Sequence, residues 1–118
     1  MQRVWVIYKH TCSTTGKSYI GLTCTGMVHR WYKHKSSARR GSASAFHSAI
    51  RKHGEDAWDS CVIHDNISSA KEAELLEKYY ISLYDTYVNG YNATTGGHYM
   101  PIHDQAYKIK TVGSFIHM

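Results

Sequence analysis

The chain of 118 residues is the length of one domain, and its 42% hydrophobic residues and single proline exclude an extensively disordered protein. A formal net charge of +5 at pH 7 favours an anionic partner. No apolar run approaches the roughly 20 residues of a membrane span, so we expect a cytoplasmic protein without a membrane partner.

Two strand-like runs open the chain. Residues 4–8 and 18–21 are rich in β-branched and aromatic side chains, which favour strands. The polar run over residues 11–17 contains a Thr-Gly pair and is typical of a hairpin loop. The sequence therefore predicts an antiparallel hairpin at the start of the domain.

A helix is predicted over residues 27–40, after the Thr-Gly pair at 25 and 26. Helical spacing gives it an apolar stripe formed by Met27, Val28, Trp31 and Tyr32. Arg30 and His34 lie one turn apart at the edge of that stripe. We expect both side chains to reach over the rim of whatever the helix covers.

The remaining elements follow from caps and composition. A second helix is expected over 44–53, before Gly54, and a third strand over 58–64. Ser69 opens the longest helix, over 70–84, with a capping box. The order β-β-α-α-β-α predicts a small α/β (α+β) domain, in which helices flank a three-stranded antiparallel sheet.

The longest helix places a carboxylate on its apolar face. Glu77 lies in the middle of a stripe formed by Ala70, Ala73, Tyr80, Ile81 and Tyr84. An inward carboxylate costs roughly several kcal/mol unless a cation, a donor or a metal meets it. We therefore expect positive charge opposite Glu77. The alternatives to a reactive site are a plain buried ion pair with Arg30 and an exposed cleft residue without chemistry. Glu72 and Lys78 are expected to face solvent.

These residue types suit phosphodiester hydrolysis, which needs an activated water and positive charge on the phosphate. Arg30 can neutralise the phosphate with a planar fork that keeps its charge. Glu77 can anchor one divalent cation whose other ligands are water and phosphate. The hydroxyls of Tyr8 and Tyr19 can orient or deprotonate water where a nearby cation lowers their pKa.

The ordered set resembles the GIY-YIG nuclease family over residues 4–97, closest to its compact homing-endonuclease branch of phages and mobile introns. Residues 6–8 (VIY) and 19–21 (YIG) resemble its paired signature, with Val6 in place of the first glycine. The other landmarks resemble its catalytic arginine and histidine, its metal-binding glutamate and its terminal asparagine: Arg30, His34, Glu77 and Asn92.

This resemblance implies a metal-dependent DNA endonuclease of a bacterium or a phage-infected cell. One Mg²⁺ or Mn²⁺ per active site would sit on Glu77. Residues 1–97 would be the catalytic domain, and residues 98–118 a tail of unpredicted structure. The implied catalytic residues are Tyr8, Tyr19, Arg30, His34, Glu77 and Asn92.

The partner implied is DNA, expected to be double-stranded. Candidate contacts to it are basic residues of the hairpin loop, the first helix and the tail: Lys17, Lys33, Lys35, Arg39, Arg40, Lys108 and Lys110. Few residues follow the domain to read a target sequence. Either the chain reads little sequence, or recognition is left to a homodimer, a separate partner or a further segment.

The main alternative is a non-catalytic nucleic-acid-binding module of the same fold. An inward glutamate argues against it, because a carboxylate repels phosphate. A structural zinc site is a minor alternative, with Cys12, Cys24, Cys61 and His10 as its ligands. No nucleophile elbow or P-loop occurs, and no His-Asn-His arrangement forms around Asn66.

Overall fold

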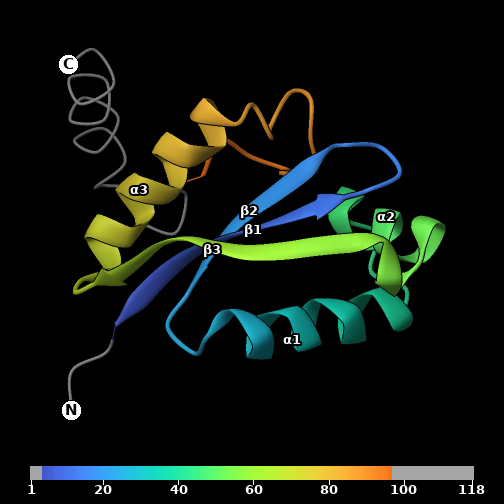
Figure 1. The fold of residues 1–118 in the computed structure, drawn as a ribbon, viewed down its shortest axis with the longest axis horizontal. Coiled ribbons are helices and arrows are strands. Elements are labelled where there is room, and N and C mark those ends of the chain that lie inside the picture. Colours follow the sequence, from blue (N-terminus) through green and yellow to red (C-terminus); the bar gives the residue numbers. More distant parts are fainter. Residues whose placement is uncertain (1–3, 97–118) are drawn as a thin grey trace.

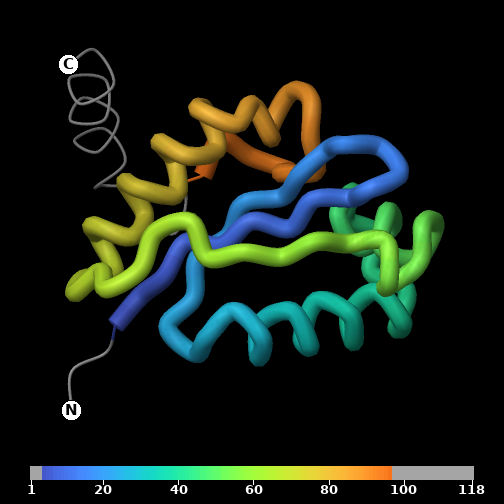
Figure 2. Tube along the Cα trace, in the orientation of Figure 1, coloured from blue at the N-terminus to red at the C-terminus, as the bar shows by residue number. Residues whose placement is uncertain are grey.

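The computed structural model describes residues 4–96 (Figures 1 and 2). Its elements are β1 (Trp5–Cys12), β2 (Ser18–Thr23), α1 (Met27–Arg39), α2 (Ala45–His53), the short 3₁₀ helix η1 (Glu55–Ala57), β3 (Trp58–Ile67) and α3 (Ala70–Leu83). This order confirms the predicted α+β class. The predicted tail over residues 98–118, with Lys108 and Lys110, lies outside the described residues.

The three strands form one antiparallel sheet in the order β2-β1-β3. Helix α3 packs on one face of this sheet, and α1 with α2 pack on the other (Figure 1). Each face has its own core. The core between the sheet and α3 is formed by Ile7, Ile20, Ile67, Ala73 and Ile81. The core between the sheet and the helices α1 and α2 is formed by Cys12, Ala38, Phe46, Ala49, Ile50 and Trp58.

Strands β1 and β3 are longer than their sequence signals. Residues 11 and 12 were expected in the loop, but Thr11 pairs with Ser18 and Cys12 with Trp58. The hydroxyls of Thr11 and Ser18 also share a hydrogen bond of 2.7 Å. Cross-strand pairing therefore overrides the polar composition of this segment.

The predicted apolar stripe of α1 is wrong for two of its four residues, since Met27 and Trp31 are partly buried but the other two are exposed. Val28 and Tyr32 are 77% and 62% exposed, whereas His34 and Ala38 are buried and Trp31 is partly buried. His34 thus lies in the interior rather than at a rim. The reason is that the sheet buries the Tyr8 hydroxyl opposite α1, where it needs a hydrogen-bond partner, and His34 Nε2 lies 2.8 Å from it.

The inward face of α3 is turned relative to the predicted stripe. Ala73 and Ile81 are buried as expected, but Glu74 is also buried and Tyr84 is 43% exposed. Lys78 is half-buried rather than fully solvated, and its ammonium contacts the Thr95 hydroxyl at 3.4 Å. Glu72 is exposed as predicted.

The three cysteines are free thiols. Within residues 4–96, no group of three or more His, Cys, Asp or Glu side chains could hold a metal ion, which removes the zinc alternative for this part of the chain. None of the helices described here has the length and apolar character needed to cross a membrane.

Two buried histidines are neutral. His10 is fully buried, its Nδ1 is 2.6 Å from the Ser60 hydroxyl, and its ring lies 4.5 Å from that of Trp31. Burial lowers the pKa of His10 to about 4, and burial aided by Arg30 lowers the pKa of His34 to about 3. Both values are below the ordinary histidine pKa of about 6.5, so protonation favours the unfolded chain.

We therefore predict a loss of stability in mild acid. Above about pH 6.5 these histidines are neutral in both the folded and the unfolded chain, so they do not lower the free energy of unfolding. As the pH drops from 6.5 to 5, each histidine lowers the free energy of unfolding by about 2 kcal/mol. Urea unfolding followed by tryptophan fluorescence measures it. His10→Phe should remove the part of this fall that His10 causes. His29→Gln, at an exposed position, should show the same fall as the wild type. A wild-type free energy of unfolding that stays constant between pH 7 and 5 contradicts the prediction.

Candidate active site

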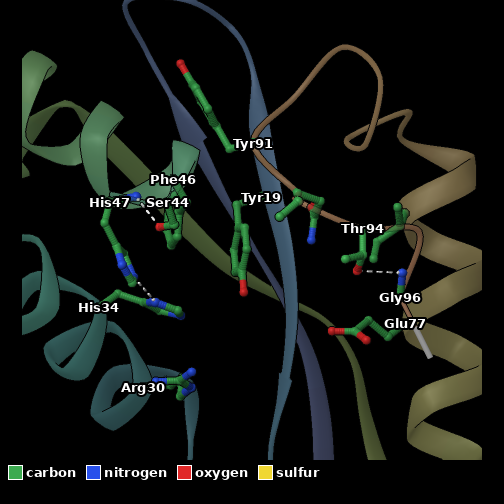
Figure 3. A pocket seen from close by; sticks show the side chains of 13 residues that line it. Tyr19, Arg30, His34, Ser44, Phe46, His47, Glu77, Tyr91, Thr94 and Gly96 are labelled. Atoms are coloured by element: carbon green, nitrogen blue, oxygen red, sulfur yellow. Dashed lines mark hydrogen bonds between the residues drawn. The ribbon is translucent and has the colours of Figure 1, made fainter. Parts of the chain in front are cut away.

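A pocket of about 260 Å³ lies across strand β2, between the two helical layers. Arg30 and His34 of α1 line one wall, and Glu77 of α3 lines the opposite wall (Figure 3). Tyr19 of β2 stands between them. The fold thus brings together four predicted site residues that lie on three separate elements.

The two tyrosines of the hairpin are not equivalent. Tyr19 lines the pocket, with its ring stacked on Phe46 at a centroid distance of 4.1 Å. Tyr8 is 1% exposed, does not line the pocket, and shares a hydrogen bond of 2.8 Å with His34 Nε2. Burial raises the pKa of both phenols, so both are protonated at neutral pH. Tyr19 therefore presents its hydroxyl, while Tyr8 supports the wall behind it.

Gly21, the glycine of the YIG motif, makes room for Tyr8. The two residues are paired on β1 and β2, and a Cβ at position 21 would overlap the Tyr8 ring and hydroxyl. Any side chain there would push the Tyr8 hydroxyl away from His34. The motif glycine is therefore a packing requirement of the buried tyrosine.

A chain of neutral side chains leads from Tyr8 to the outer end of the pocket wall. His34 Nδ1 is 3.0 Å from His47 Nε2, and His47 Nδ1 is 2.7 Å from the Ser42 hydroxyl. Burial, with Arg30 next, lowers the pKa of His47 as well. A neutral imidazole donates from one nitrogen and accepts at the other, so all hydrogen bonds of this chain run in one direction.

Sequence reasoning missed His47 and Ser42. His47 lies in the first turn of α2, where it follows the Ser44 cap, and its partner His34 belongs to another helix. No local spacing marks such a pair. The sole sequence signal is the abundance of histidine, with nine in the chain.

Arg30 and Glu77 carry the two formal charges of the pocket lining (Figure 3). After burial, the Glu77 carboxylate is the next cause of the raised Tyr19 pKa, and Arg30 opposes it. Gly96 leaves space for the carboxylate, since a Cβ at this position would lie 3.3 Å from Glu77 Oε1. A cation and an anion therefore face each other beside the Tyr19 hydroxyl.

The pocket suits a hard divalent cation. Its single carboxylate, Glu77, offers oxygen ligands, and residues 4–96 contain no three-ligand cage. Mg²⁺ is commonly bound by one or two carboxylates and retains waters or takes phosphate oxygens as its other ligands. The donor set thus fits the Mg²⁺ or Mn²⁺ that the sequence led us to expect.

Asn92 lines the pocket, but its amide holds the backbone. Its Oδ1 accepts from the Ile20 N–H and its Nδ2 donates to the Ile20 carbonyl, both at 2.8 Å. The Tyr91 N–H also donates to the Ser18 carbonyl at 2.9 Å. A Cβ at Gly90 would lie 2.6 Å from that carbonyl. The GYN motif thus pairs with the edge of β2 and fixes Tyr19.

None of the predicted DNA-contacting residues within the described part of the chain lines this pocket. Arg39 is held by both carboxylate oxygens of Glu55 at 2.7 Å, and Arg40 contacts the Ser36 hydroxyl at 2.9 Å. The ammonium of Lys35 lies 5.7 Å from the Trp31 ring centroid. Lys33 is exposed on α1, and Lys17 borders a second hollow between the hairpin loop and α2.

Comparison with known proteins places the chain in a structural context. The sequence profile of the GIY-YIG catalytic domain matches residues 4–92. A mutant of the catalytic domain of intron endonuclease I-TevI has a similar fold, with a TM-score of 0.70, 19% identity, and coverage of 78% of this chain and 95% of that chain. A structure of the catalytic domain of homing endonuclease I-TevI is also similar, with a TM-score of 0.68, 20% identity, and coverage of 76% of this chain and 98% of that chain. No curated protein sequence matches significantly.

The bidentate contact of Asn92 with Ile20 leads to a prediction. Asn92→Ala should speed hydrogen exchange of the Ile20 amide and lower stability by about 1–3 kcal/mol. Asn92→Asp should keep that amide protected, because an acceptor remains, yet also lose stability, because the Ile20 carbonyl loses its donor. NMR-detected exchange and thermal melting measure both effects.

The exposed Asn66→Asp is the matched control and should leave the Ile20 amide unaffected. Unchanged exchange in Asn92→Ala would show that the side chain does not hold β2.

Proposed function

The chain belongs to the GIY-YIG catalytic domain family, whose profile matches most of its length, and we propose that it is a metal-dependent DNA endonuclease. One observation carries this proposal: Arg30 and Glu77 face each other across a pocket into which Tyr19 presents its hydroxyl. The two similar structures are catalytic domains of an intron or homing endonuclease, which supports DNA as the substrate.

Arg30 would bind the non-bridging oxygens of the scissile phosphate. Its guanidinium stays charged and can form two parallel hydrogen bonds, so it neutralises the charge that develops in the transition state. Glu77 would hold one Mg²⁺ or Mn²⁺, which when bound supplies further positive charge for the phosphate and the leaving oxygen.

Tyr19 would orient the attacking water. As the water oxygen bonds to phosphorus, its proton would pass to the phenolate form of Tyr19. The leaving oxygen would depart with the bonding electron pair and take a proton from solvent water. Burial raises the pKa of this phenol, so the phenolate is a minor species at neutral pH. The rate of hydrolysis should therefore depend on the fraction of ionised Tyr19.

Tyr8, His34 and Asn92 would position these groups. The Tyr8–His34 hydrogen bond of 2.8 Å fixes the wall next to Arg30, and Asn92 fixes the strand that carries Tyr19. His34 has a pKa of about 3, so it stays neutral at the pH of the reaction and does not repel Arg30.

Glu77→Gln should abolish Mg²⁺-dependent cleavage and leave DNA affinity equal or tighter, because it removes both the metal ligand and a charge that repels phosphate. Plasmid nicking with and without EDTA, together with a binding titration, measures these effects. Glu72→Gln, at an exposed position of the same helix, is the control and should cleave normally. Undiminished cleavage by Glu77→Gln would remove Glu77 from the site. Binding by the wild type without any cleavage would instead favour the non-catalytic module.

Arg30→Lys should also be severely impaired although the charge is kept, since an ammonium cannot form the planar fork. We expect a loss of about 100-fold in the single-turnover rate, equivalent to about 3 kcal/mol of transition-state stabilisation. Arg51→Lys, on α2 and outside the pocket lining, should retain the wild-type rate. If Arg30→Lys also retains it, the arginine acts only through its charge.

A further inference from the structure

A second hollow of about 320 Å³ lies beside the active-site pocket. It lies between the hairpin loop, which contributes Lys17, and the last turn of α2, which contributes Lys52 and His53. Tyr91 lines this hollow and also the active-site pocket. The two hollows are therefore neighbours that meet at one side chain.

The charges of this second hollow suit an anion. Its lining includes two exposed lysines and no acidic residue. Glu55, which follows α2 closely in the chain, is engaged by Arg39 at 2.7 Å. Lys52 also has a structural reason to be there, because a cation favours the carboxyl end of a helix. Lys17 lies in a loop and has no such reason.

The shape of the hollow is set by small and fixed groups. Ala45, Ser48 and Ala49 of α2 line it without filling it. The Tyr91 hydroxyl is held by Thr15 Oγ1 at 2.8 Å, and its ring packs 5.4 Å from that of Trp58. The shared wall is therefore preorganised rather than assembled on binding.

We propose that Lys17, Lys52 and Tyr91 form a backbone subsite that binds a phosphate of the DNA strand next to the one that is cleaved. The strand would run from Arg30 and Glu77 past Tyr91 onto the groove between the hairpin loop and α2. This inference rests on the proposed function, because it takes DNA as the substrate. Contacts of this kind position the strand and carry no sequence information.

Metal-free DNA binding tests the subsite without requiring cleavage. The dissociation constant of the full chain for a short duplex is measured in EDTA over a range of salt concentrations. The double variant Lys17→Gln/Lys52→Gln should bind more weakly, and the slope of log Kd against log salt should fall by about 0.9 for each phosphate that the variant no longer neutralises. Lys71→Gln, exposed on α3 and outside the hollow, is the control and should keep the wild-type slope.

A melting experiment completes the test. The melting temperature of the double variant should equal that of the wild type. An unaltered salt slope, an equal fall in the control or a markedly lower melting temperature would each overturn the subsite. Failure of the wild type to cleave would contradict the endonuclease instead, and the salt slopes measured in EDTA would still decide the subsite.

Discussion

The buried hydrogen bond between Tyr8 and His34 is the contact on which the site depends. It joins the central strand to α1 at 2.8 Å, across 26 residues of sequence. Both groups are almost fully buried, so removal of either partner would leave a desolvated polar atom at a cost of about 1–3 kcal/mol. This bond turns the polar face of α1 inward. As a result Arg30, one turn before His34, lies in the pocket wall.

The site forms at an edge of the sheet because the two helical layers can meet there. Strand β2 is an edge strand, and the Asn92 amide occupies its free backbone groups at Ile20. The segment after α3 is thereby drawn across the edge, with Glu77 facing the layer that carries Arg30. A phosphate bound between them would be contacted from both faces of the sheet.

The sequence predicted the features that depend on local pattern. The structure and the family match confirm the order of the elements, the inward Glu77 and the family resemblance. These features follow from periodicity and from the order of motifs, which can be read directly along the chain. Hydrophobic spacing mispredicted the inward face of α1. It assigned Val28 and Tyr32 to that face, whereas the buried His34 occupies it because it meets the hydroxyl of Tyr8. The His34–His47 pair and the Arg39–Glu55 pair join residues 13 and 16 positions apart on different elements. Such pairs exist only once the helices pack, so no rule of local spacing predicts them.

The pH dependence of DNA cleavage tests most directly whether Tyr19 serves the attacking water. Only the phenolate of Tyr19 accepts the water proton, so the single-turnover rate at saturating Mg²⁺ should rise about tenfold per pH unit at every pH below the pKa of this phenol. Tyr19→Phe should be about 100-fold or more slower at the alkaline end of this range and should lose the rise with pH. Cleavage by Tyr19→Phe at the wild-type rate, with the same pH profile, would contradict this role for the phenol.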